Sequence, residues 1–268
     1  MSSFNNKVVV ITGGSDGIGK ALVEHFLQLG AKVSTCGRNY DKLYQLQQAN
    51  AGKALHIFTA DVSKEQECKN FIDATITTYN TIDILINNAG VSMRSLFADV
   101  ELDTLRKVMD INFWGTLNCT KFCLPYITKN KGTIVGVSSI AGYRGLPGRT
   151  AYSASKFAVN GFMEALRTEL LHTGVNVMWV CPGFTSSNIR NAALTSNGNA
   201  QEESPMDEGK MMSSEACATH IINAIEKRKR TLVLTFTGKR AVFMNRFFAS
   251  LADKLTHNFF FKNGILVK

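Results

Sequence analysis

The 268-residue sequence lacks several features that define whole classes of protein. It has no run of about 18 apolar residues, the length that crosses a bilayer. Residues 1–7 are polar and lead into an apolar segment, without the basic flank, apolar core and cleavage site of a secretory signal. With 45% hydrophobic and 19% charged residues, the composition argues against disorder and coiled coil. We expect a globular, cytoplasmic protein.

Cysteine pairs of the CxxC type are also missing. The six cysteines are scattered along the chain, which favours reduced thiols that act as small apolar residues in a reducing compartment. Cys119 and Cys123 lie one helical turn apart, but no histidine or further cysteine completes a ligand set. We therefore expect no metal site.

No fixed repeat and no low-complexity linker divides the chain, and strand-like and helical stretches alternate along it. Helical spacing occurs over residues 18–29 and 41–48. This alternation predicts βαβ units, and hence an α/β protein with a doubly wound parallel sheet that helices cover on both faces. The expected strands are 7–12, 31–36, 54–60, 82–86, 133–137 and 175–180.

The turn after the first expected strand, TGGSDGIG at residues 12–19, is rich in glycine. Glycines let the backbone approach a pyrophosphate, and the helix that follows offers free N–H groups. The spacing is not GxGxxG, and a merely tight turn would also need glycines. The candidates for cofactor binding in this turn are Gly13, Ser15, Gly17, Ile18 and Gly19.

The second expected strand ends in CGRN, residues 36–39, without the acid that would bind the ribose 2′-hydroxyl of NAD. The guanidinium of Arg38 suits bidentate contact with a 2′-phosphate and stacking on adenine. Asp16 in the glycine turn would repel that phosphate, and a solvated Arg38 with no ligand is the alternative. On balance the pattern favours NADP(H) over NAD(H).

Tyr152 and Lys156 are four residues apart and would share one face of a helix. An ammonium beside a phenol lowers the phenol pKa from about 10, which makes proton transfer feasible near neutral pH. The spacing alone is weak, because any helix with a tyrosine and a lysine can supply it.

The complete order of motifs is more specific. TGxxxGxG at residues 12–19 and NNAG at 87–90 come first, then Ser139, YxxxK at 152–156 and Pro182-Gly183 after a strand. In these motifs and their spacing, residues 7–187 resemble the short-chain dehydrogenase/reductase family. GRN at residues 37–39 resembles its NADP(H)-dependent members. The overall pattern, with Ser213-Ser214-Glu215 and the basic run 227–230, is similar to the 11β-hydroxysteroid dehydrogenase-like and 3-ketosphinganine reductase-like branches.

The resemblance implies a single Rossmann-type domain of about seven parallel strands that moves a hydride between nicotinamide and a carbonyl or secondary alcohol. Ser139 would hold the substrate carbonyl oxygen, Tyr152 would exchange the proton, and Lys156 would also bind the nicotinamide ribose. Asn112 would anchor a water in the proton relay. Further residues implied at the cofactor are Asp61, Val62, Asn87, Asn88, Ala89, Gly90, Pro182, Gly183, Thr185 and Ser187.

The substrate is less defined than the reaction. The resemblance points to a lipophilic ketone, with a 3-oxoacyl thioester or small-ketone reductase as the alternative. A catalytically silent dinucleotide-binding scaffold is a third possibility, against which the intact Ser139, Tyr152 and Lys156 argue. A homodimer or homotetramer is the expected assembly.

Residues 1–225 form the expected catalytic domain, with residues 184–215 as its substrate loop, and residues 226–268 form an extension. The net charge is +9, and the extension holds ten Lys/Arg against two Asp/Glu, with seven of the 17 phenylalanines. Over 240–255 a helical pattern puts Met244, Phe247 or Phe248, Leu251 and Leu255 on one face. This basic amphipathic segment would pack on the domain or a second subunit, or contact an anionic membrane through residues 240–261. No nucleic-acid-binding module is recognised, so nucleic acid is not an expected partner.

Overall fold

The computed structural model describes residues 2–204, 206–207, 209 and 211–268. Its main sheet has seven parallel strands in the order β3-β2-β1-β4-β5-β6-β7, which confirms the predicted α/β fold. The strands are β1 (Val8–Thr12), β2 (Lys32–Gly37), β3 (Leu55–Thr59), β4 (Ile84–Asn87), β5 (Thr133–Val137), β6 (Asn176–Cys181) and β7 (Thr231–Val233).

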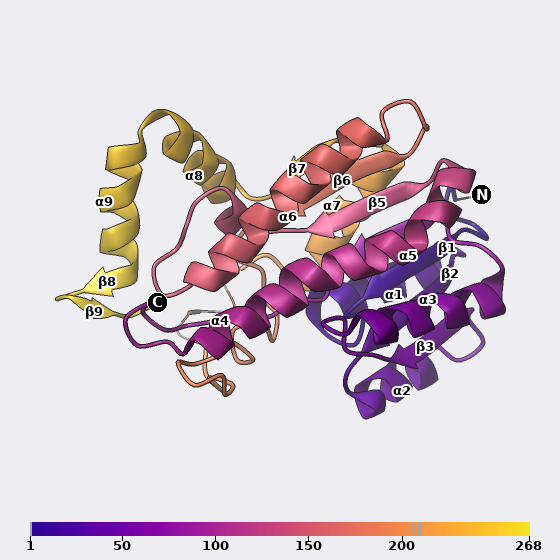
Figure 1. Ribbon diagram of the computed structural model, residues 1–268, viewed down its shortest axis with the longest axis horizontal. Coiled ribbons are helices and arrows are strands. Elements are labelled where there is room, and N and C mark those ends of the chain that lie inside the picture. Colours follow the sequence, from indigo (N-terminus) through magenta and orange to yellow (C-terminus); the bar gives the residue numbers. More distant parts are fainter. Residues whose placement is uncertain (1, 205, 208, 210) are drawn as a thin grey trace.

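Helices cover both faces of this sheet (Figure 1). One face carries α1 (Gly17–Gln28), α2 (Tyr40–Ala49) and α7 (Ser214–Glu226). The other carries α3 (Glu65–Tyr79), α4 (Leu102–Met109), α5 (Gly115–Asn130) and α6 (Thr150–Glu169). This three-layer arrangement is the one that parallel sheets require, because each crossover helix must lie on a face.

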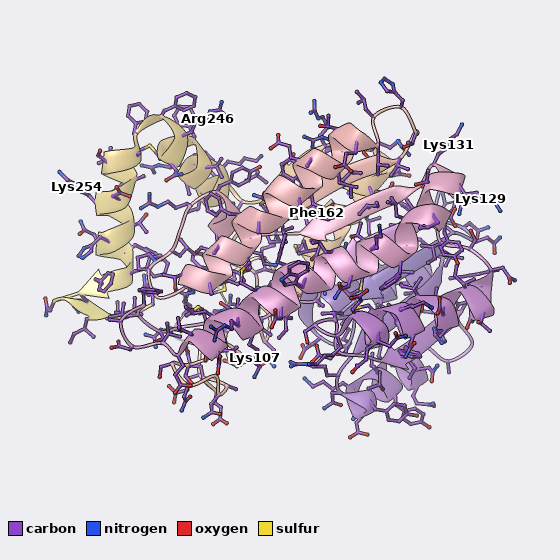
Figure 2. All side chains as sticks on the ribbon, in the orientation of Figure 1. Lys107, Lys129, Lys131, Phe162, Arg246 and Lys254 are labelled. Atoms are coloured by element: carbon purple, nitrogen blue, oxygen red, sulfur yellow. The ribbon has the colours of Figure 1, made fainter. Side chains whose placement is uncertain are left out.

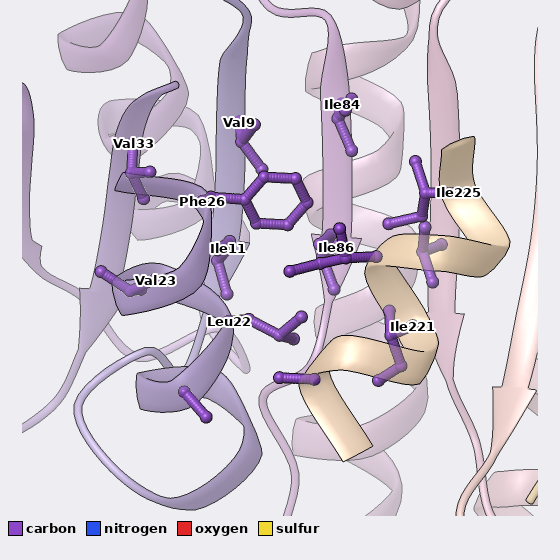
Figure 3. Close-up of a cluster of buried hydrophobic side chains, with 14 of the residues drawn as sticks. Val9, Ile11, Leu22, Val23, Phe26, Val33, Ile84, Ile86, Ile221 and Ile225 are labelled. Carbon is purple, nitrogen blue, oxygen red and sulfur yellow. The ribbon is translucent and has the colours of Figure 1, made fainter. Parts of the chain in front are cut away.

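The sequence of β1 shows why both faces need cover. All five of its residues are buried. Val9 and Ile11 belong to the core beneath α1 and α7, where Phe26 and Ile221 are packed (Figure 3). Val10 belongs to the core on the opposite face. A strand that is apolar on both sides is stable only between two helical layers.

The strand order reverses between β1 and β4. From β1 the chain continues outward to β2 and β3, and from β4 it continues outward in the opposite direction to β7. The loops that follow β1 and β4 therefore diverge at the carboxyl end of the sheet, where a crevice opens in folds of this kind.

The C-terminal region differs from the expectation in two ways. β7 belongs to the main sheet, so the boundary expected after residue 225 falls before the last strand. The single amphipathic helix expected over 240–255 is wrong: the structure has α8 (Phe236–Phe247) and α9 (Ala249–Phe260), which are separated at Phe248. No proline or glycine marks that break in the sequence, so the pattern could not show it. A short hairpin of β8 (Phe261–Lys262) and β9 (Ile265–Leu266) follows.

The cysteines fill the core. All six are buried in the described structure and none forms a disulfide. Burial raises the pKa of Cys36 and Cys181 to about 12, so these thiols stay protonated at neutral pH. Within the described part of the chain, no helix is both long and apolar enough to cross a membrane.

Candidate active site

A cleft of about 330 Å³ lies at the carboxyl ends of the parallel strands. Its walls come from the turn after β1, the end of β2, the loops after β3, β4, β5 and β6, and the start of α6. Most of the residues predicted from the sequence line it: Gly13, Ser15, Gly17, Ile18, Gly19, Arg38, Asp61, Val62, Asn88, Ala89, Gly90, Ser139, Tyr152, Lys156, Pro182, Gly183, Thr185 and Ser187.

The glycine turn between β1 and α1 has no space for side chains at three of its positions, Gly13, Gly14 and Gly19. Gly13 has a φ of +68° and Gly17 a φ of +51°, conformations that L-residues with side chains rarely adopt. A Cβ on Gly19 would lie 2.1 Å from the Gly13 carbonyl oxygen. Gly19 therefore lets α1 start in close contact with the turn, which lines the cleft at the N-terminus of the helix, where a phosphate would bind.

Hydrogen bonds join the loop after β4 to this glycine turn. The Thr12 hydroxyl accepts hydrogen bonds from the backbone N–H groups of Asn88 and Ala89, both at 3.0 Å. In return, Nδ2 of Asn88 donates to the carbonyl oxygens of Thr12 at 3.0 Å and Gly13 at 3.1 Å. The two loops that diverge from the sheet are therefore joined. Sequence reasoning did not identify this function of Thr12.

Asn87 and Asn112 lie behind the cleft wall, and Asn87 was expected to line the cleft. Asn87 is the last residue of β4, and its side chain points toward α5, where Nδ2 donates to the Thr120 hydroxyl at 2.9 Å. Asn112 is 1% exposed. Its Oδ1 accepts from the Val91 N–H at 2.8 Å, and its Nδ2 donates to the Val91 carbonyl at 2.9 Å and the Ser155 hydroxyl at 3.0 Å. The Asn112 amide thus joins three segments of the fold.

Asn112 occupies a local irregularity. Residues Asp110–Trp114 form one turn of π-helix, η1, between α4 and α5. Such turns are rare and occur often at functional sites. Gly90 lies against it, because a Cβ there would be 3.1 Å from Oδ1 of Asn112 and 3.5 Å from Nζ of Lys156. Asn112 is thereby a positioning residue for the loop that faces Lys156.

Ser139, Tyr152 and Lys156 come together at one end of the cleft. Ser139 precedes a 3-10 turn, η2 (Ile140–Gly142), and is hydrogen-bonded to Tyr152 on the first turns of α6. Nζ of Lys156 lies 5.6 Å from the centre of the Tyr152 ring. It donates to the Val137 carbonyl oxygen at 2.9 Å. The expected grouping of these three side chains is what the structure shows.

The charges around Tyr152 differ from the expectation. Burial raises the pKa of Tyr152, while the hydrogen bond from Ser139 and the positive charge of Arg149 lower it. Lys156 had been expected to lower the phenol pKa. Burial lowers the pKa of Lys156 itself to about 8, and its ammonium is bonded to a backbone carbonyl. Arg149, one helical turn before Tyr152, and Arg190 are the cations that lower the phenol pKa here.

Arg38 lies exposed at the end of β2 and lines the rim of the cleft. Asp16, the acid expected to oppose a phosphate here, forms an ion pair with Lys42, with Nζ 2.8 Å from Oδ2. It also caps α1 by accepting the Gly17 N–H at 2.8 Å. Lys42 was missed in the sequence, although it lies only four residues after Arg38 and on the first turn of the next helix.

The segment after Pro182-Gly183 forms a wall of the cleft at the end away from the glycine turn. It is tied to the loop after β4, because Arg94 N–H donates to the Leu194 carbonyl at 2.8 Å and Leu194 N–H to the Ser92 carbonyl at 2.9 Å. Here the lining combines apolar and cationic residues, which are Leu146, Phe184, Ile189, Arg149 and Arg190. Met206, Met211 and Met212 lie outside the lining in the described structure, and residues 205, 208 and 210 of this segment lie outside the described residues.

A sequence profile of the family described as short chain dehydrogenase matches residues 7–198. The chain belongs to this family. The "Dehydrogenase/reductase SDR family protein 7-like" of Dictyostelium discoideum is 33% identical over 268 residues, which cover 96% of this short-chain dehydrogenase and 83% of that protein. The "11-beta-hydroxysteroid dehydrogenase-like 4A" of Arabidopsis thaliana is 33% identical over 243 residues, 89% of this chain and 79% of that one.

A solved structure agrees with the fold of this short-chain dehydrogenase. The crystal structure of a short chain dehydrogenase/reductase from Burkholderia phymatum in complex with NAD has a TM-score of 0.82 and 23% sequence identity. The likeness covers 94% of this chain and 96% of that one. The predicted family and the oxidoreductase class are thus confirmed, and the plant relative agrees with one of the branches that the sequence pattern resembles.

Proposed function

We propose that this protein is a cytoplasmic, NADP(H)-dependent oxidoreductase that transfers a hydride between nicotinamide and the carbonyl or secondary alcohol of a lipophilic compound. One observation carries the proposal. Ser139, Tyr152 and Lys156 meet at one end of a cleft whose other end is an open glycine turn at a helix N-terminus.

The chain's residues fit a dinucleotide. Gly13, Gly17 and Gly19 line the cleft at the start of α1, where backbone N–H groups would bind a pyrophosphate. Asp61, Val62 and the loop 88–90 would hold the adenosine half and the middle of the cleft, and Pro182, Gly183, Thr185 and Ser187 the nicotinamide end. When bound, the cofactor supplies the hydride, while the protein supplies position and charge.

We assign proton transfer to the side chains at the end of the cleft where Ser139, Tyr152 and Lys156 meet. The Ser139 hydroxyl would hold the carbonyl oxygen of the substrate within reach of the Tyr152 phenol, which gives its proton to that oxygen during reduction. The positive charges of Arg149 and Arg190 would stabilise the phenolate that remains, while Nζ of Lys156 lies 5.6 Å from the centre of the ring. Alcohol oxidation reverses these steps.

The preference for NADP(H) is supported by charge at the end of β2. Arg38 lines the cleft where a 2′-phosphate would lie, and no acid stands at the end of that strand in the sequence. Lys42 offsets the negative charge of Asp16. A lipophilic substrate is supported by Leu146, Phe184 and Ile189 in the lining and by the name of the plant relative. A homodimer or homotetramer stays a prediction.

Replacing Tyr152 tests the proposed function. NADPH and NADH oxidation would be followed with ketones from short to long chain, which also separates a lipophilic substrate from a 3-oxoacyl thioester or a small ketone. Tyr152→Phe removes the proton donor, so we expect kcat to fall by about 100-fold or more with cofactor affinity nearly unchanged.

Tyr143→Phe is the matched control. The Tyr143 hydroxyl accepts from Nε1 of Trp179 at 3.1 Å and lies away from the cleft lining, so activity should stay within about twofold. If Tyr152→Phe kept most of its activity, Tyr152 would not be the proton donor. Tight NADPH binding without turnover of any ketone or thioester would favour the silent scaffold.

A further inference from the structure

Large apolar side chains gather on the outside of α8 and α9. Six of them, between 48% and 82% exposed, form what we call the α8–α9 surface: Phe236, Phe243, Phe247, Phe248, Leu251 and Leu255. The Phe243 ring touches those of Phe247 and Phe248, with centroids 4.9 Å and 6.3 Å apart, at the bend between the two helices. Single exposed apolar residues are ordinary, but a cluster of this kind indicates a binding surface.

Positive charge surrounds this cluster. Residues 236–268 contain six Lys/Arg and one Asp/Glu. That acid, Asp253, is paired with Arg144 at 2.6 Å. Figure 2 shows Arg246 on α8 and Lys254 on α9, and the Arg246 guanidinium lies 5.8 Å from the centre of the Phe247 ring. Aromatic residues flanked by cations match the boundary between anionic headgroups and acyl chains.

The structure also bears on the alternative occupants. The six residues are exposed, so they do not pack on the domain; the opposite side of α9, with Ala252 and Phe260, is the buried side. α8 and α9 carry four Lys/Arg, so a second copy docked on the same surface would bring two sets of four cations together, which repulsion opposes. An anionic lipid surface complements both the charge and the apolar cluster.

We propose that the α8–α9 surface binds an anionic membrane and holds the mouth of the cleft beside it. Phe259 on α9 stacks on Phe184 of the cleft lining, with ring centroids 6.1 Å apart. A second cavity of about 540 Å³ lies between α9 and the loop before α6, and Leu146 lines both this cavity and the cleft. Leu146 and the Phe184–Phe259 pair thus connect α9 with the lining of the cleft.

The position of α9 relative to the cleft is fixed by two arginines. Nη2 of Arg94 donates to the Leu266 carbonyl and Nη1 of Arg149 donates to the Lys268 carbonyl, both at 3.2 Å. The Arg149 guanidinium also lies 5.2 Å from the centre of the Phe260 ring. The hairpin and α9 are therefore docked against residues of the active-site region, and a membrane bound to α9 lies next to the substrate end.

Vesicle co-sedimentation tests the proposal. The purified protein should sediment at low salt with vesicles of phosphatidylglycerol and phosphatidylcholine in equal parts, and much less with pure phosphatidylcholine or at raised salt. Phe243→Ser with Phe247→Ser should weaken the partition by about tenfold or more, because both rings leave the acyl boundary. Arg240→Gln with Arg246→Gln should weaken it and reduce its dependence on salt.

Phe97→Ser with Leu171→Ser is the matched control, because these residues are 65% and 67% exposed but lie outside α8 and α9. That pair should keep vesicle binding. No sedimentation of the wild type at low salt, or equal loss in both serine pairs, overturns the proposal. A dimer in light scattering that the Phe243 and Phe247 changes dissolve, without vesicle binding, would assign the surface to a second copy instead.

The delivery of substrate rests on the proposed function and has its own measurement. For a long-chain ketone embedded in anionic vesicles, kcat/KM should fall about as much as vesicle binding does in the Phe243 and Phe247 variant. For a small water-soluble ketone, kcat/KM should stay unchanged. An unchanged value for the embedded ketone overturns delivery. If no ketone is turned over, the proposed function fails, while the sedimentation result still decides the membrane contact.

Discussion

At the scale of single residues, Lys156 combines a positive charge with a nearly dry environment. It is 4% exposed, and its ammonium donates to the Val137 carbonyl at 2.9 Å. A neutral acceptor satisfies the hydrogen bond but offsets little of the cost of burying the charge. That cost appears as a pKa lowered to about 8. In an unfolded chain the lysine pKa would be about 10.4.

This difference predicts a pH-dependent stability. Between about pH 8 and pH 10.4 the unfolded chain binds more protons than the native protein, so raising the pH stabilises the native state. The buried charge thus destabilises the protein below pH 8, and its cost disappears above about pH 10.4. From pH 7 to pH 10.5, wild type should gain about 3 kcal/mol in free energy of unfolding relative to Lys156→Met.

Urea unfolding of both proteins across that pH range would measure the gain. Other titrating groups affect wild type and variant alike, so the difference between the two isolates Lys156. A difference that stays constant from pH 7 to pH 10.5 would show that Lys156 is not buried with a lowered pKa.

The reactive residues were the most predictable part of the site. Ser139, Tyr152 and Lys156 were predicted because the complete order of motifs resembles the family, and all three line the cleft. Neither the direction in which Asn87 points nor the charge that Arg149 brings to Tyr152 could be read from the chain. Both depend on how a strand end and a helix start face their neighbours, which no local pattern records.

At the scale of elements, the starts of α1 and α2 meet at the rim of the cleft. Asp16 caps α1, Asn39 caps α2 by accepting the Lys42 N–H at 2.9 Å, and Lys42 bridges back to Asp16. Arg38 lies between the two helices in sequence and lines the cleft. The local charge available to a 2′-phosphate is therefore set by two helix starts together.

Arg38→Ala should change the cofactor preference. Charge-assisted hydrogen bonds contribute about 1.5–3 kcal/mol, so kcat/KM with NADPH should fall about 10- to 100-fold while the value with NADH changes little. Lys42→Ala should cause a smaller fall with NADPH, because it leaves the Asp16 charge unbalanced. Steady-state kinetics with both cofactors would measure this.

Lys20→Ala is the control on α1, because Lys20 faces Glu24 at 4.0 Å and lies outside the cleft lining. It should leave both values unchanged. Equal losses with NADPH and NADH in Arg38→Ala, or a wild type that prefers NADH, would refute the assignment of Arg38 to a 2′-phosphate.

Elements with a strong repeat were predicted well, and the last helices were not. β1, β2 and β5 are short apolar runs that end in turn residues, so their positions were evident. The break at Phe248 was not evident, because Phe247-Phe248-Ala249 suits a continuous helix. The break depends on how α8 and α9 are each held by the body of the protein, and that information is tertiary.

At the scale of the whole molecule, Arg144 links the body to both C-terminal helices. It donates through Nη1 to Oδ1 of Asn245 on α8 at 2.8 Å and pairs through Nη2 with Asp253 on α9 at 2.6 Å. The Asn245 amide returns a hydrogen bond to the Tyr143 carbonyl at 2.8 Å. Figure 1 shows these helices extending beyond the layered body.

Arg144→Ala should therefore loosen α8 and α9 without unfolding the sheet. In hydrogen exchange, amides of residues 236–260 should exchange several-fold faster, whereas those of β1, β4 and β5 should keep their protection. Global free energy of unfolding should change by less than about 1 kcal/mol, because the ion pair is partly exposed.

Arg106→Ala, which removes an exposed pair with Asp103 on α4, is the control and should leave exchange in residues 236–260 unchanged. Faster exchange throughout the sheet in Arg144→Ala would show that the C-terminal helices and the body unfold as one unit.

The hydrogen bonds between Thr12 and the loop of Asn88 and Ala89 bear on how a ligand enters. These hydrogen bonds join the loops that follow β1 and β4, the two strands between which the strand order reverses. They use only protein atoms. The gap between the two loops is thereby held at a set width in the free protein. The binding site for a dinucleotide would therefore be preorganised, so little binding free energy would be lost in ordering the chain around the ligand.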